Sequence, residues 1–76
     1  MMNERDKAEA SIIAVEIGKS NHGDFLKHIF AAWISADPRN KVLMMPLILA
    51  LMSRYDLKEE YAGAIKEHLR EYLDRA

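Results

Sequence analysis

The stretch Val42-Leu-Met-Met-Pro-Leu-Ile-Leu-Ala-Leu-Met52 contains eleven consecutive residues without a polar side chain. A helix needs roughly 20 such residues to cross the hydrocarbon core of a bilayer, so this run is too short to span a membrane. It is also apolar on every side, whereas a helix at a protein surface shows one apolar stripe. The run must therefore be covered, either by the rest of its own chain or by a second molecule.

Two interpretations of this cover are open. The run can be a central core helix wrapped by three others, or one side of it can form an interface together with part of the preceding helix. Fully burying one large aliphatic side chain contributes roughly 1.5–3 kcal/mol, so leaving half of the run in water would forfeit an amount comparable to the stability of a whole domain. A two-fold homodimer is the commonest way to cover such a surface. The candidate interface residues are Phe30, Trp33, Met44, Met45, Leu47, Ile48, Leu51 and Met52.

Length and composition indicate one small domain, residues 1–76. The chain has no cysteine, which excludes disulfides and thiolate metal sites. Its 11 basic and 12 acidic residues nearly cancel, which argues against both a general polyanion binder and an acidic DNA mimic. The polar start, residues 1–7, is not followed by the apolar segment of a signal peptide. We therefore expect a soluble, cytoplasmic protein with no membrane association.

Helical periodicity dominates the first half of the chain. Asn3 is a candidate N-cap for a helix from about Glu4 to Gly18. The alternation within Ile12–Ile17 also suits a strand, but a lone strand would have no partner in this chain. After a loop over residues 19–23, Asp24 is predicted to cap a second amphipathic helix that ends near Ala36.

Two prolines and one acidic cluster divide the second half. Asp37 suits an N-cap and Pro38 the first position of a third helix. Pro46 removes a backbone hydrogen bond inside that helix, so we expect a kink there, or a break into segments 38–44 and 46–54. The sequence from Asp56 to Glu59 resembles a capping box that opens a final helix, to about residue 74. The predicted fold is all-α, a four-helix bundle-like domain with its third helix kinked or broken at Pro46.

Candidate catalytic and metal-binding residues are few. Asp24 and His28 lie four apart on one helical face, with His22 close in sequence, but a metal site needs three or four converging ligands. His68 lies on an apolar stripe between tyrosines, as packed core histidines do. No histidine accompanies a serine in a recognised nucleophile turn; the serines are Ser11, Ser20, Ser35 and Ser53. We therefore expect neither catalysis nor a bound metal or other cofactor.

A helix-turn-helix is the main alternative to a protein-binding role. The second helix, the Asp37-Pro38 turn and the third helix follow in the right order. A recognition helix must present polar and basic side chains to base edges, and only Arg39, Asn40 and Lys41 do so here. Basic residues of the last helix are diluted by acidic ones. A small nucleic-acid-binding transcriptional regulator is thus the second hypothesis.

The middle of the chain also carries a resemblance. Asp24-Phe25-Leu26, the string Ala32-Trp-Ile-Ser-Ala-Asp-Pro-Arg-Asn40, Pro46 and Tyr55 resemble small helical proteins encoded by phages and prophages, which have no assigned activity. The resemblance implies a protein that binds and blocks a host protein, including defence complexes such as CRISPR effectors. It transfers no functional residues. The sequence therefore predicts a non-catalytic interaction module, homodimeric or bound to a larger partner protein.

Overall fold

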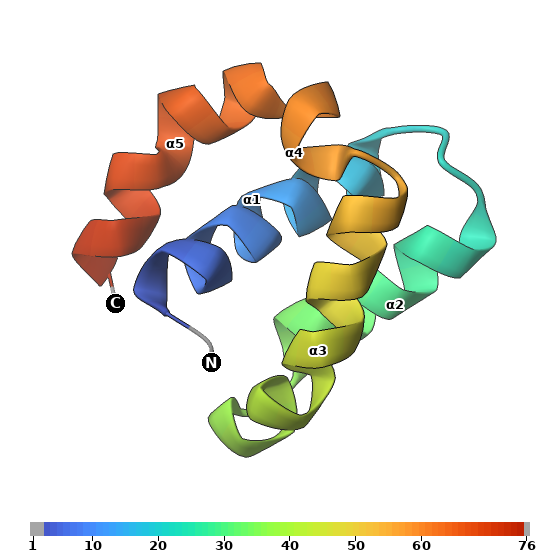
Figure 1. The fold of residues 1–76 in the computed structure, drawn as a ribbon, viewed down its shortest axis with the longest axis horizontal. Coiled ribbons are helices and arrows are strands. Elements are labelled where there is room, and N and C mark those ends of the chain that lie inside the picture. Colours follow the sequence, from blue (N-terminus) through green and yellow to red (C-terminus); the bar gives the residue numbers. More distant parts are fainter. Residues whose placement is uncertain (1–2, 76) are drawn as a thin grey trace.

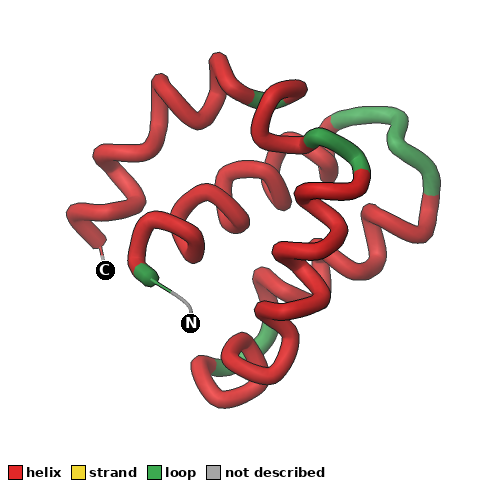
Figure 2. Tube along the Cα trace, viewed as in Figure 1, coloured by secondary structure: helices red, strands yellow, loops and turns green. Residues whose placement is uncertain are grey.

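The computed structural model describes residues 3–75, which are helical throughout apart from short connections and contain no strand (Figures 1 and 2). The all-α prediction is confirmed, but residues 3–75 form five helices instead of four. They are α1 (Glu4–Lys19), α2 (Asp24–Ser35), α3 (Pro38–Arg54), α4 (Leu57–Glu60) and α5 (Ala62–Arg75). In the described part of the chain, none of these helices is long and apolar enough to span a bilayer.

The start of α1 follows the predicted capping chemistry. The side chain of Asn3 accepts a hydrogen bond of 2.7 Å from the backbone N–H of Asp6, which meets one of the unpaired donors at the helix start. Acidic Glu4 and Asp6 lie in the first turn, near the positive end of the helix dipole. Residues Ile12–Ile17 are helical, so the strand alternative is wrong.

The central helix is α1, which contacts each of the other four helices (Figure 1). Its small side chains explain this position, because Ala10 and Ala14 let neighbouring helices approach closely while Ile13 and Ile17 fill the space between them. All four side chains are at most 5% exposed. The helix that is wrapped by the others is therefore α1 and not the apolar third helix.

One charged side chain is buried in α1. Glu9 is only 5% exposed, and its carboxylate lies 3.2 Å from the Lys58 ammonium and 3.5 Å from the Arg5 guanidinium. A buried carboxylate is tolerated when it is paired in this way. The pair with Lys58 joins the middle of α1 to α4.

The caps of α2 and α3 agree in part with expectation. Gly23, at a φ of +88°, is the N-cap of α2, and Asp24 lies one residue later in the first turn, so the predicted Asp24 cap is wrong. Glycine suits that left-handed backbone because it has no Cβ. At α3, Asp37 accepts a 2.8 Å hydrogen bond from the Asn40 N–H and Pro38 occupies the first helical position, as predicted.

Pro46 does not break α3, which runs without interruption over 17 residues. The predicted break is wrong; the predicted kink stays a prediction. Proline inside a helix costs roughly 3 kcal/mol, and the nearby α3 residues Met45, just before it, and Ile48, two residues after it, bury their side chains. Pro46 itself is exposed, so its ring takes no place in the core.

The predicted final helix is divided in two. Asp56 precedes α4 in a left-handed conformation, with φ of 52° and ψ of 41°, and its side chain caps nothing. The capping box is therefore wrong; the Asp56 carbonyl accepts the Glu59 and Glu60 N–H groups instead. Leu57 is completely buried, which holds α4 against the core, and Tyr61 separates it from α5. This turn lets α5 lie along α1.

Candidate functional site

Most of the eight candidate interface residues belong to the core of the subunit. Six are 0–7% exposed: Phe30, Trp33, Met45, Ile48, Leu51 and Met52. Met44 is half-buried, and Leu47 is 45% exposed. These six side chains offer almost no surface to a second molecule in the single chain, and the predicted set of interface residues stays a prediction. The existence of an interface stays a prediction.

The opposite side of the same helix is apolar and open to solvent. We call this surface the α3 face and define it by Val42, Leu43, Pro46, Leu47 and Ala50. Val42 is 58% exposed and Leu43 is 76% exposed. The members follow one another at intervals of one, three and four residues, which places them on one side of the helix. A helical projection of the apolar run would have separated this side from the buried one.

The α3 face has a distinctive charge setting. Arg39 lies one turn before its first members, and Arg54 lies one turn after Ala50. Including Lys41, α3 carries three basic residues and no acidic one. Two acidic residues flank the helix, Asp37 at its N-cap and Asp56 two residues after Arg54, and the others belong to the other helices. Within the helix itself, the α3 face is therefore an aliphatic strip with cationic ends.

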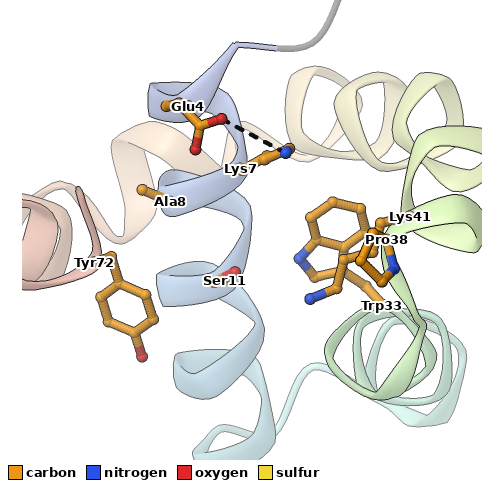
Figure 3. A pocket seen from close by; sticks show the side chains of 8 residues that line it. All are labelled: Glu4, Lys7, Ala8, Ser11, Trp33, Pro38, Lys41 and Tyr72. Atoms are coloured by element: carbon orange, nitrogen blue, oxygen red, sulfur yellow. Dashed lines mark ion pairs between the residues drawn. The ribbon is translucent and has the colours of Figure 1, made fainter. Parts of the chain in front are cut away.

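A pocket of about 480 Å³ lies on another side of the molecule, between α1, the start of α3 and α5 (Figure 3). Trp33 forms part of its wall, with no exposed surface of its own. The Lys41 Nζ lies 5.3 Å from the centroid of the indole ring. Among the described residues, the buried indole Nε1–H has no hydrogen-bond acceptor. Leaving a buried donor without any acceptor costs about 1–3 kcal/mol of stability.

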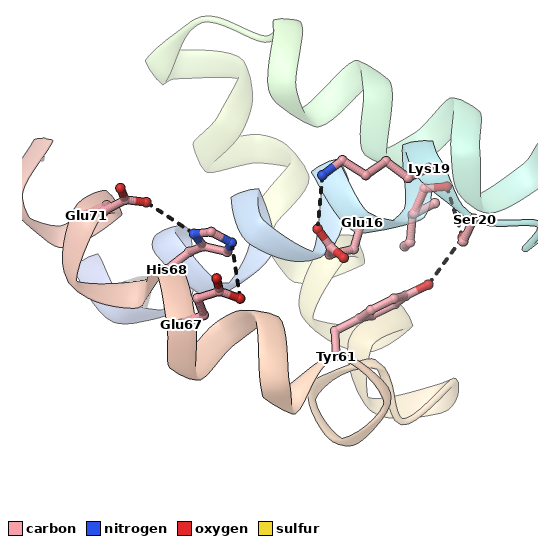
Figure 4. A network of polar contacts seen from close by, with 8 residues as sticks. Glu16, Lys19, Ser20, Tyr61, Glu67, His68 and Glu71 are labelled. Atoms are coloured by element: carbon pink, nitrogen blue, oxygen red, sulfur yellow. Dashed lines mark hydrogen bonds and ion pairs between the residues drawn. The ribbon is translucent and has the colours of Figure 1, made fainter.

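A polar cluster joins the end of α1 to the junction of α4 and α5. The Tyr61 hydroxyl donates a hydrogen bond of 3.2 Å to the Ser20 Oγ (Figure 4). Next to it, His22 Nε2 lies 2.5 Å from a carboxylate oxygen of Glu60. Burial raises the pKa of the Tyr61 phenol above its usual value, and the negative charge of Glu60 adds to the effect. These contacts fix the loop after α1, so we assign the cluster a structural role.

The candidate catalytic serines are dispersed. Ser20 bonds Tyr61, and Ser35 donates back to the carbonyls of its own helix. Ser11 faces the pocket, and Ser53 is exposed. In residues 3–74 no serine hydroxyl bonds a histidine, so the geometry contains no activated Ser–His pair.

The histidines are also separate from one another. His28 is exposed, His22 pairs with Glu60, and the His68 ring bonds Glu71 on its own helix at 3.2 Å (Figure 4). Across the described part of the chain, no three His, Asp or Glu side chains come together as metal ligands. Asp24 and His28 thus gain no third ligand.

The molecule therefore offers two surfaces of interest, the α3 face and the Trp33 pocket. No protein-family model, curated protein or solved structure significantly matches this chain.

Proposed function

We propose that this chain is a non-catalytic protein–protein interaction module that pairs with a second copy of itself through the α3 face. The observation that supports the proposal is the continuous exposure of Val42, Leu43 and Leu47, at 58%, 76% and 45%, along one side of a helix. Covering apolar surface gains roughly 25 cal/mol per Å², and large continuous apolar patches are unusual on monomeric proteins.

A two-fold pair with antiparallel α3 helices fits this surface best. A two-fold interface brings the same patch of both subunits together, so each aliphatic strip would cover the other. The antiparallel arrangement also sets the helix dipoles in opposition. The Arg39 end of one copy then lies near the Arg54 end of the other. This repulsion is small at exposed positions and is screened by salt, so self-association should strengthen as the salt concentration rises.

Analytical ultracentrifugation tests the pairing. The weight-average mass of the wild-type chain should rise from 8.7 kDa toward twice that value over the micromolar range. Leu43→Asp should raise the dissociation constant by at least about tenfold, because it would bury an unpaired carboxylate in the interface. The matched control is Leu73→Asp, which changes a leucine that is 38% exposed on α5, a helix without contact to α3.

Two results would contradict the pairing. One is a wild-type mass of 8.7 kDa at every concentration up to the high micromolar range. The other is an equal loss of association in the control variant, which would show that Leu43 has no special place in the contact. Circular dichroism of each variant establishes that its helices are intact.

Alternatively, the α3 face binds a larger partner protein instead of a second copy of the chain. The resemblance to small phage proteins supports a partner in the host, such as a defence complex that the chain would block. The cationic ends of the α3 face favour a partner whose apolar groove has an acidic rim. Such binding should weaken with salt, the opposite of the trend for self-pairing.

Nucleic-acid binding is the second candidate, favoured by the three basic and no acidic residues of α3. The exposed side chains between Arg39 and Arg54 are mainly aliphatic, which suits base edges and phosphates poorly. DNA retention that falls steeply with salt would support this function. Absence of retention at low salt would remove it.

A further inference from the structure

The Trp33 pocket lies on the far side of α3 from the α3 face. Lys41, which lines the pocket, precedes Leu43 by two residues and is therefore turned about 200° around the helix axis from it. The pocket volume of about 480 Å³ falls in the range of small-molecule sites. Ligand binding in this pocket does not depend on the proposed pairing.

Two hydrogen-bond donors of this pocket have no acidic partner among the described residues. The Trp33 indole N–H has no acceptor, and Lys41 forms no ion pair with any carboxylate in residues 3–74. Lys7 is paired with Glu4 at 3.6 Å. Figure 3 shows the indole nitrogen and the Lys7 ammonium directed into the space between α1 and the α2–α3 turn. One uncompensated positive charge and one unmet donor therefore border the same space.

An apolar extension adjoins these donors. A smaller hollow of about 150 Å³ shares Ser11, Lys41 and Tyr72 with the pocket and adds Val15 and Ile34 to its walls. A ligand whose polar head lies at Lys41 can thus place an apolar body against these two side chains. Glu4 at the rim adds negative charge, which disfavours a dianion such as a phosphate monoester.

We propose that the pocket binds a small organic monocarboxylate with an aromatic or short aliphatic body. One carboxylate oxygen accepts from the Lys41 ammonium and the other from the Trp33 Nε1–H, a charge-assisted pair of hydrogen bonds. Because Trp33 has no exposed surface, the ligand reaches the indole N–H only when neighbouring side chains move, and Lys41, whose Nζ lies 5.3 Å from the ring centroid, is a flexible one on the pocket wall. No proton or group transfer is involved.

The single tryptophan makes the test direct, because the protein has only one indole N–H signal in a proton–nitrogen NMR spectrum. Sodium benzoate is the probe and benzamide, its uncharged analogue, is the comparison. Benzoate should shift the indole signal in a saturable way, whereas benzamide should bind at least about tenfold more weakly because it lacks the charge. This comparison uses the wild-type chain and needs no variant.

A matched pair of variants locates the site. Lys41→Gln should weaken benzoate binding about tenfold, since it removes the charged donor and keeps the length of the side chain. Lys66→Gln removes an equal charge from an exposed position that borders a different hollow, and should leave the affinity unchanged. An indole signal that millimolar benzoate does not move would overturn the proposal. Equal binding of benzamide, or an equal loss in both variants, would overturn it as well.

Discussion

Helix α1 is less hydrophobic than the apolar run of α3, yet α1 is the helix that the rest of the chain covers more completely. The longest apolar run lies in α3, yet that helix buries one side and leaves Val42, Leu43 and Leu47 exposed. In α1, charged residues interrupt the pattern, yet this helix contacts all four others. Side-chain size accounts for the difference, because the small buried side chains of Ala10 and Ala14 leave room for several helices beside α1. A helix covered with large side chains holds its neighbours away and needs more cover than a short chain provides.

The largest test of this contrast removes one aliphatic side chain from each helix. Ile13→Ala on α1 should lower the free energy of unfolding by about 2–5 kcal/mol, because it leaves a cavity in the core. Leu43→Ala on α3 should change that free energy by less than about 0.5 kcal/mol at concentrations where the chain is monomeric. Urea unfolding followed by circular dichroism measures both. Equal losses would show that the two positions are buried alike.

The second test adds volume instead of removing it. Ala10→Leu should destabilise the fold by about 1–3 kcal/mol, because the completely buried Ala10 has no space for a larger side chain. Ala50→Leu is the matched change on the exposed side of α3 and should cost less than about 0.5 kcal/mol. Thermal unfolding compares the two variants. A tolerated leucine at position 10 would contradict close approach at α1.

The third test concerns the one buried charge of α1. Lys58→Ala removes the nearer cation from the Glu9 carboxylate and leaves Arg5 as its partner. We expect a loss of about 1 kcal/mol, reduced from the cost at a fully buried pair because the Lys58 side chain is 51% exposed. Arg70→Ala on α5 is the control, with no expected change, because Arg70 is exposed and does not line the hollow beside Glu9. Chemical denaturation at low and high salt measures the difference.

The smallest effect should be the alkaline pH dependence at the end of α1. The pKa of Tyr61 is raised in the folded chain by burial, so the folded state holds the phenol proton more tightly than the unfolded state. Stability from this group is complete below the unfolded pKa of about 10 and is lost as pH rises above it. Tyr61→Phe should make the decline in melting temperature above that pH shallower. An identical decline in both proteins would contradict the assignment.

Several features were predictable from local sequence chemistry. Asn3 and Asp37 cap their helices as their side chains and positions indicate, and Pro38 occupies the first turn, where a missing N–H costs nothing. These predictions succeed because capping involves only residues three apart. The left-handed Asp56 and the division between α4 and α5 were not predictable, because both depend on how Leu57 reaches the core and how Lys58 reaches Glu9.

The candidate site shows the same division. An excess of apolar side chains is visible in the order of residues, but that order leaves open whether the excess is fully covered or partly exposed. Which side of α3 is exposed depends on where α1 and α2 lie, and that placement brought Trp33 and Met45 into the core and left Leu43 outside. The Trp33 pocket joins residues from four helices. Periodicity along one helix determines which side chains share a face, but only packing between helices decides which face meets water.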